Sequence, residues 1–224
     1  MFSVTWIVSV SLLVVSFAGI VISALMFAKP VDEYKFSFMR MFPFEVGRTA
    51  ENNRKFYSFF VYLFAGLCFA PLVIIVGGKS DLNALKPMSI LTTCALGLGG
   101  LCFIFLNIFD VTHVKPHLSL FTVFAALVIL SGGLIFARGM TGYKIYLDHN
   151  HQEIIFLVTE ILAGLSVVIT LLLLVNPKLR LWAKLDNVDG TYKRPKYFVL
   201  AYSEWGLLTL LFFNELVFFV QLLK

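Results

Sequence analysis

Residues 153–175 read EIIFLVTEILAGLSVVITLLLLV, and no charged residue lies between Glu160 and the end of this stretch. An α-helix rises about 1.5 Å per residue, so it needs about 20 apolar residues to cross the roughly 30 Å of hydrocarbon in a bilayer. A transmembrane β-strand would be shorter and would alternate apolar with polar residues. The stretch therefore predicts a membrane-spanning helix.

Five further apolar runs of similar length accompany this one. Together the six runs cover residues 3–28, 57–77, 87–109, 118–138, 153–175 and 197–222. The bilayer core offers no water to backbone groups, so only helices and closed barrels can span it. We predict an all-α polytopic integral membrane helical bundle of six transmembrane helices, forming a single domain over residues 1–224. Pro71 is expected to kink the second helix.

The composition agrees with a membrane protein and excludes several other classes. The chain is 59% hydrophobic and only 14% charged, whereas soluble domains are about 45–50% apolar and about 25% charged. The 18 basic residues lie almost wholly between the apolar runs, so the net charge of +5 does not indicate nucleic-acid binding. The three cysteines lie inside apolar runs without a CxxC pair, so we expect no redox site.

The basic residues also predict an orientation. Thirteen Lys and Arg residues fall in the first, third and fifth loops, and five fall on the other side of the predicted membrane, Arg138 among them. Cytoplasmic loops carry an excess of Lys and Arg. We therefore expect the odd-numbered loops in the cytoplasm and both termini outside.

Small residues mark the helix faces that are expected to pack closely. They are Ala65, Gly66 and Ala70 in the second helix, Ala95, Gly97, Gly99 and Gly100 in the third, and Ser131, Gly132 and Gly133 in the fourth. Small side chains let helix backbones approach within a membrane. These faces serve packing within one chain or, alternatively, self-association.

Three carboxylates lie well inside the apolar runs: Glu160, Glu204 and Glu215. An ionisable group inside a bilayer is costly unless it is paired or hydrated, so each is a candidate functional residue. Glu204 is expected near the odd-loop side of the membrane. Its partner there is expected to be Arg48 or His117.

A candidate polar pocket follows at this headgroup layer. It is formed by Glu45, Arg48, His113, His117 and Glu204, with Trp205 as its wall. In one interpretation the carboxylate holds the amine or glycerol part of a lipid and Arg48 binds its phosphate in bidentate fashion. In the other, the same residues form a structural network that holds the first loop onto the bundle.

Metal and catalytic chemistry are not indicated. His113 and His117 are four residues apart, a zinc-like spacing on a helix, but Pro116 disfavours helical backbone at Lys115, so no shared face is expected. No strained elbow or oxyanion motif accompanies Ser119. We expect no metal, no cofactor and no catalytic activity.

Several short motifs together resemble those of a known family. They are Phe42-Pro43-Phe44 in a long first loop, His117 at the start of the fourth helix, and Glu204-Trp205 in the sixth. In these the chain resembles the Frag/DRAM/Sfk family of six-helix membrane proteins. After Phe44 the chain departs from the family pattern. The resemblance implies roles in lipid handling, trafficking and modulation of partner proteins, and it implies cytoplasmic termini, opposite to the charge count.

Three functional hypotheses follow. The first is a non-catalytic module that associates with membrane lipids or regulates other proteins through the polar pocket. The second is an accessory subunit whose small-residue and aromatic faces bind other membrane protein subunits. The third is an ion or proton pathway, which requires Glu160, Glu204 and Glu215 to line one hydrated route.

Overall fold

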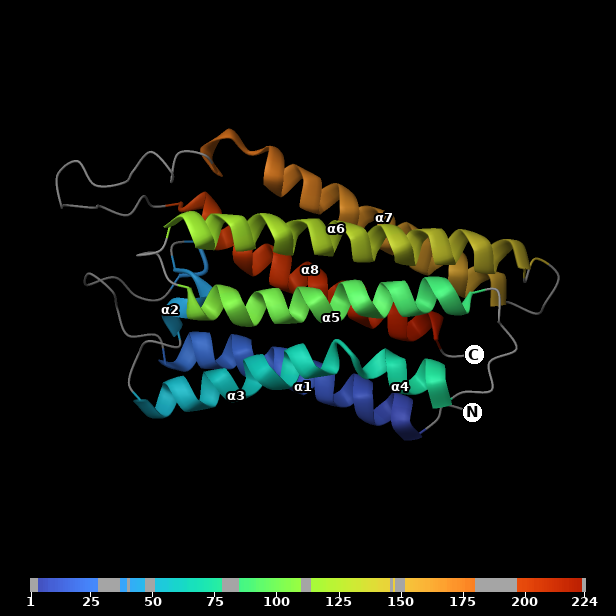
Figure 1. The fold of residues 1–224 in the computed structure, drawn as a ribbon, viewed down its shortest axis with the longest axis horizontal. Helices are drawn as coiled ribbons and strands as arrows, with labels where there is room; N and C mark the ends of the chain where they lie inside the picture. The colour runs from blue at the N-terminus through green and yellow to red at the C-terminus, as the bar shows by residue number, and fades with distance from the viewer. Residues whose placement is uncertain are drawn as a thin grey trace.

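The computed structural model of the protein describes residues 4–27, 37–39, 41–46, 51–77, 85–109, 114–145, 147, 152–179 and 197–222. These residues form an all-helical bundle (Figure 1). Its helices are α1 (Val4–Phe27), α2 (Pro43–Val46), α3 (Glu51–Leu67), α4 (Ala70–Gly77), α5 (Lys86–Ile108), α6 (Val114–Ile145), α7 (Gln152–Val175) and α8 (Val199–Gln221). Within the described residues, six helical segments are long and apolar enough to cross a membrane, α3 and α4 forming one of them. The protein is a multi-pass integral membrane protein.

Two of the helices are longer than the apolar runs that predicted them. The second span begins at Glu51 rather than near residue 57, and α6 extends from Val114 to Ile145 rather than from 118 to 138. Polar residues favour helix as well as apolar ones do, so a helix continues where the hydropathy falls. The helix at Lys115 contradicts the expectation from Pro116. Proline is tolerated in a first turn, where its missing N–H would have no helical partner.

The kink expected at Pro71 is confirmed as a break between α3 and α4. Pro71 has no N–H to donate to the carbonyl of Leu67, which removes one rung of the helical ladder. At the break, the Cys68 N–H still donates to the Phe64 carbonyl at 3.1 Å, and the Phe69 N–H donates to the Gly66 carbonyl at 3.1 Å. The second of these is the tighter bond of a 3₁₀ turn.

The six spans alternate in direction, so both chain ends lie at the same end of the bundle (Figure 1). We call this the terminal end. The opposite end, which holds α2 and the first residues of α3, α6 and α8, is the α2 end. Of the spans, α8 is the most buried and α7 the least. Helix α1 runs antiparallel to α8, and the Trp6 Nε1–H donates to the Phe219 carbonyl at 2.8 Å.

Some of the small residues pack helix against helix within this chain. A Cβ atom on Gly100 of α5 would lie 2.9 Å from the Cα of Ala65, so α3 and α5 touch through their backbones here. Gly132 of α6 faces α7 instead, where a Cβ would lie 2.9 Å from Val167. Gly133 faces open space. Close backbone approach at Gly100 therefore sets the spacing of α3 and α5.

Candidate functional site

The described part of the first loop, residues 37–39 and 41–46, docks on the beginning of α8. The Phe198 N–H donates to the Met39 carbonyl at 2.7 Å, and the Trp205 Nε1–H donates to the Met41 carbonyl at 2.8 Å. The Phe38 ring meets the Trp205 ring edge-on at 4.9 Å between centroids. These contacts join residues about 160 positions apart in the chain, and they fix the described part of the first loop against α8.

The local sequence explains why α2 forms. Pro43 occupies the first helical position, where its fixed φ is favourable and its missing N–H costs nothing. Glu45 reaches back so that its Oε2 accepts the Phe42 N–H at 2.8 Å. A glutamate at the third helical position that binds the N-cap N–H is half of a capping box. All four residues of α2 are buried, so this turn acts as a plug with Phe42 and Phe44 on its inner face.

His117 and Glu204 form the polar centre beneath this plug. The His117 Nε2 lies 2.6 Å from the Glu204 Oε1, and the His117 Nδ1 lies 2.7 Å from the Phe109 carbonyl oxygen. The Phe109 carbonyl can only accept a hydrogen bond, so Nδ1 carries a hydrogen. The bond between His117 Nε2 and Glu204 Oε1 then holds one proton, shared by the two atoms. The two side chains are 0% and 2% exposed. The pair is therefore neutral as a whole wherever that proton resides.

Aromatic rings close the pair off from solvent. Phe42 and Phe44 contact the imidazole edge-on, at 5.7 and 5.5 Å between centroids. Phe198 packs edge-on against Phe42 at 5.0 Å. We call this buried pair, together with the Phe42 and Phe44 rings that cover it, the latch.

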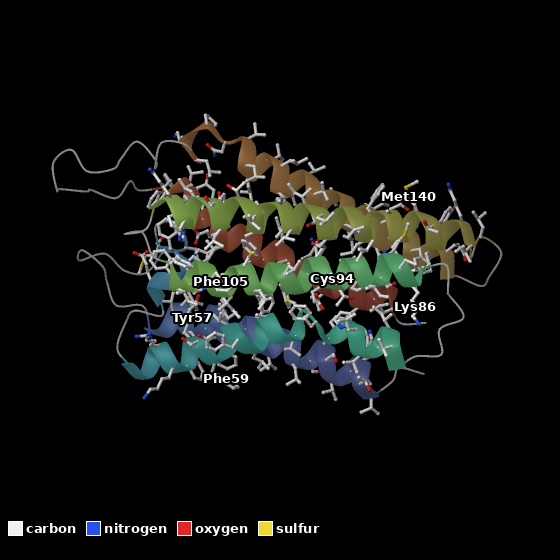
Figure 2. The ribbon with its side chains drawn as sticks, viewed as in Figure 1. Tyr57, Phe59, Lys86, Cys94, Phe105 and Met140 are labelled. Atoms are coloured by element: carbon white, nitrogen blue, oxygen red, sulfur yellow. The ribbon has the colours of Figure 1, made fainter. Side chains whose placement is uncertain are left out.

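Open space lies beside the latch, between α3 and α5. A cavity of about 260 Å³ is lined by Phe44, Arg54, Tyr57, Ser58, Val61, Tyr62, Ile104, Asn107 and Ile108. Phe44 belongs to both structures, since one ring contacts His117 and lines the cavity. Figure 2 shows Tyr57 between α3 and α5, with Phe59 on the outer side of α3.

The polar groups of the cavity are held in fixed positions. The Tyr57 hydroxyl donates to the Asn107 Oδ1 at 2.9 Å, and the Asn107 Nδ2 donates to the Phe103 carbonyl at 2.7 Å. Tyr57 is only 2% exposed and lies close enough to Glu204 to interact with its charge. Arg54 is exposed at the beginning of the span. The cavity thus has a fixed polar floor, a cation at its edge and apolar walls.

The structure brings together four of the six site residues expected from the sequence. His117, Glu204, Trp205 and Glu45 lie at one place, and Glu45 is near enough to Glu204 to interact with its charge. Arg48 and His113 lie outside the described residues. Sequence reasoning missed Arg54, Tyr57 and Asn107. Arg54 and Ser58 are four residues apart and share a helix face at the start of an apolar run, and this spacing was the signal that could have indicated Arg54.

A second polar cluster occupies the terminal end. Arg138 is 3% exposed, and its Nε–H donates to the Ser89 Oγ at 2.9 Å. One of its terminal nitrogens donates to the Gln221 Oε1 at 3.1 Å. Arg138, which the charge count placed on the side opposite the odd-numbered loops, is a buried residue of α6. The run seemed to end there because a basic residue lowers hydropathy wherever it lies.

The three carboxylates of the apolar runs lie on two helices, α7 and α8. Glu204 and Glu215 lie on one face of α8, but Leu208 and Leu211, both buried, occupy the same face between them. Glu160 lies on α7 against Gly139 of α6.

No known protein family, curated protein or solved structure matches this chain. The resemblance to the Frag/DRAM/Sfk family stays a prediction.

Proposed function

We propose that this protein is a non-catalytic membrane module that binds the headgroup of an anionic phospholipid in the cavity between α3 and α5. The observation that carries the proposal is the pairing of an exposed cation, Arg54, with a fixed polar floor at the beginning of a membrane span. A phosphodiester needs a cation and hydrogen-bond donors at headgroup depth, and acyl chains need apolar surface next to them. The cavity offers both.

The size of the cavity decides which part of a lipid it holds. Pockets that enclose a whole small-molecule ligand measure about 300–1,000 Å³, and this one measures about 260 Å³. It is too small for a complete phospholipid and suits a phosphate with its glycerol. The acyl chains would then lie on the outside of α5, where Phe105 and Ile108 are exposed.

The donors around the cavity suit a phosphate. Arg54 presents a planar guanidinium that binds two phosphate oxygens at once. Ser58 and Tyr62 add hydroxyl groups from the same helix. Tyr57 and Asn107 are engaged with each other, so they shape the floor without themselves requiring a ligand.

The charge distribution selects an anionic lipid. Exposed basic residues of the α2 end include Arg54, Lys115 and Lys178. We propose that this end faces the cytoplasm, in agreement with the excess of basic residues in the odd-numbered loops. The cytoplasmic leaflet carries the anionic lipids, and each nearby basic residue contributes about 1 kcal/mol to attraction toward it.

The latch gives the module a means of regulation. Phe44 contacts the His117 ring on one side and lines the cavity on the other. Any change that releases residues 37–39 and 41–46 from α8 therefore removes one wall of the lipid site. This links the first loop to lipid binding, and it agrees with the lipid handling that the family resemblance implies.

Native mass spectrometry of the protein in phosphatidylcholine nanodiscs doped with phosphatidylglycerol tests the proposal. We expect the wild type to retain phosphatidylglycerol selectively and Arg54→Gln to lose this preference. Lys178→Gln is the matched control, since Lys178 is exposed at the same end but does not line the cavity. Equal retention of both lipids by the wild type, or an unchanged preference in Arg54→Gln, would refute the proposal.

A further inference from the structure

Glu215 is a buried carboxyl group without a hydrogen-bond partner among the described residues. Its exposed fraction is 0%, and neither Oε1 nor Oε2 has a donor or acceptor within hydrogen-bond distance. It lies in α8, six residues before Gln221 and therefore about 9 Å from the level of that residue along the helix axis. In this it differs from Glu204, which has His117 as a partner.

Few titratable groups face Glu215 from the helices around it. Within the described residues, α1 and α4 contribute none, and Cys94 of α5 is exposed on the outside of the bundle. Arg138 of α6 donates to Ser89 and Gln221. Glu160 of α7 lies at the level of Gln221, because its chain neighbour Thr159 accepts a hydrogen bond from the Gln221 side chain. Cys68 is close enough to interact with Glu215 electrostatically.

Cys68 lies at the break between α3 and α4. Irregular backbone at membrane depth is tolerated only where protein buries it or where it lines a hydrated cavity. The carbonyl of Leu67 has lost the N–H that residue 71 would have supplied, because that residue is Pro71.

An ionised carboxylate in this position would need a counter-charge. Burial of an isolated charge in a low-dielectric interior is so costly that the group takes up a proton or binds a cation instead. The described surroundings supply no cationic side chain to Glu215, and a proton needs no extra volume. A carboxylate that accepts one proton becomes an uncharged carboxylic acid, which restores neutrality without any other ligand.

We propose that Glu215 is a proton-binding site in the core of the bundle. Toward the α2 end, Leu208 and Leu211 fill the same face of α8 over three turns, up to Glu204. This apolar layer separates the two carboxyl groups by about 16 Å of helix, so the site binds protons without conducting them across the membrane.

Labelling with dicyclohexylcarbodiimide tests the proposal, because this apolar reagent adds to protonated carboxyl groups in membrane interiors. The intact protein in nanodiscs is treated over a range of pH, and adducts are counted by mass spectrometry and assigned by peptide mapping. We expect one adduct on Glu215, a labelling rate that falls as the pH rises, and complete loss of the adduct in Glu215→Gln. Glu160→Gln is the matched control and should keep the adduct.

Three results would overturn the proposal. They are no adduct on Glu215 at any pH, an adduct that persists in Glu215→Gln, and protection of Glu215 by sodium ions at constant pH, which would assign the site to a metal cation. Peptide mapping of the wild type identifies the labelled residue even if Glu215→Gln does not fold. Proteoliposomes containing the wild type should hold a pH gradient as well as those containing Glu215→Gln, and a wild-type leak would contradict a site that binds protons without conducting them.

Discussion

The imidazole of His117 and the carboxyl group of Glu204 lie 2.6 Å apart although 87 residues separate them in the chain. This bond joins the first turn of α6 to α8, and the Phe109 carbonyl holds the other ring nitrogen. Phe42 and Phe44 cover the pair. His117 thus links the end of α5, the start of α6 and α8, and the rings of the first loop cover this contact.

Removing the carboxyl group of Glu204 should destabilise the protein more than replacing it with an amide. In Glu204→Ala the His117 Nε2 loses its partner in a buried site, and breaking such a pair costs about 3–5 kcal/mol. In Glu204→Gln the amide N–H can donate to Nε2, because the Phe109 carbonyl keeps the hydrogen on Nδ1. We expect that variant to lose about 1 kcal/mol or less. Reversible unfolding in mixed micelles measures both, and equal losses would show that the pair does not depend on this bond.

Trp205→Phe should loosen the first loop with little effect elsewhere. The substitution keeps an aromatic side chain but removes the Nε1–H that donates to the Met41 carbonyl, and the lost hydrogen bond is worth about 1 kcal/mol. Hydrogen exchange of the Phe198 amide, which donates to the Met39 carbonyl, reports the docking of the loop. Trp6→Phe is the matched control because it removes a bond of the same 2.8 Å length from α1 to α8. Faster exchange at Phe198 is expected in the first variant alone.

Gly100→Ala should destabilise the bundle whereas Gly133→Ala should not. A methyl group at Gly100 would meet the Ala65 backbone at 2.9 Å, and such overpacking costs about 1–3 kcal/mol. A methyl group at Gly133 meets nothing within 4 Å, and alanine in a helix gains about 0.5–1 kcal/mol over glycine. Thermal unfolding of the two variants should therefore shift in opposite directions. A common shift would contradict the close approach of α3 and α5.

Arg138→Met should destabilise the terminal end of the bundle. The substitution removes the donor that binds the Ser89 Oγ and the Gln221 Oε1. A buried polar group that loses its hydrogen-bond partner costs about 1–3 kcal/mol of stability. The Phe156 and Phe218 rings also lose the guanidinium, which lies 5.7 Å from each centroid. Lys144→Met serves as the control, since Lys144 is exposed near the end of the same helix. Similar stability of the two variants would mean that Arg138 contributes nothing beyond its charge.

Sequence reasoning succeeded where one physical requirement dominated. The six spans followed from hydropathy because a bilayer forces continuous helices, and the break near Pro71 followed from its missing N–H. The expectation that Glu204 has a partner is confirmed at His117. The same reasoning does not hold for Glu215, which has no hydrogen-bond partner among the described residues. A single carboxylate in an apolar run does not reveal whether its neighbour helix offers a donor.

The sequence by itself determined that the chain crosses a membrane six times, because the transfer of apolar residues into hydrocarbon depends on composition and length alone. Only the tertiary structure decided which polar groups meet. The assembly of α3 and α5 around the cavity, the burial of Arg138 and the isolation of Glu215 depend on how the helices rotate and pack. Those rotations result from short-range contacts such as that of Gly100 with Ala65, and hydropathy is blind to them because it records how apolar a residue is and not which neighbour it touches.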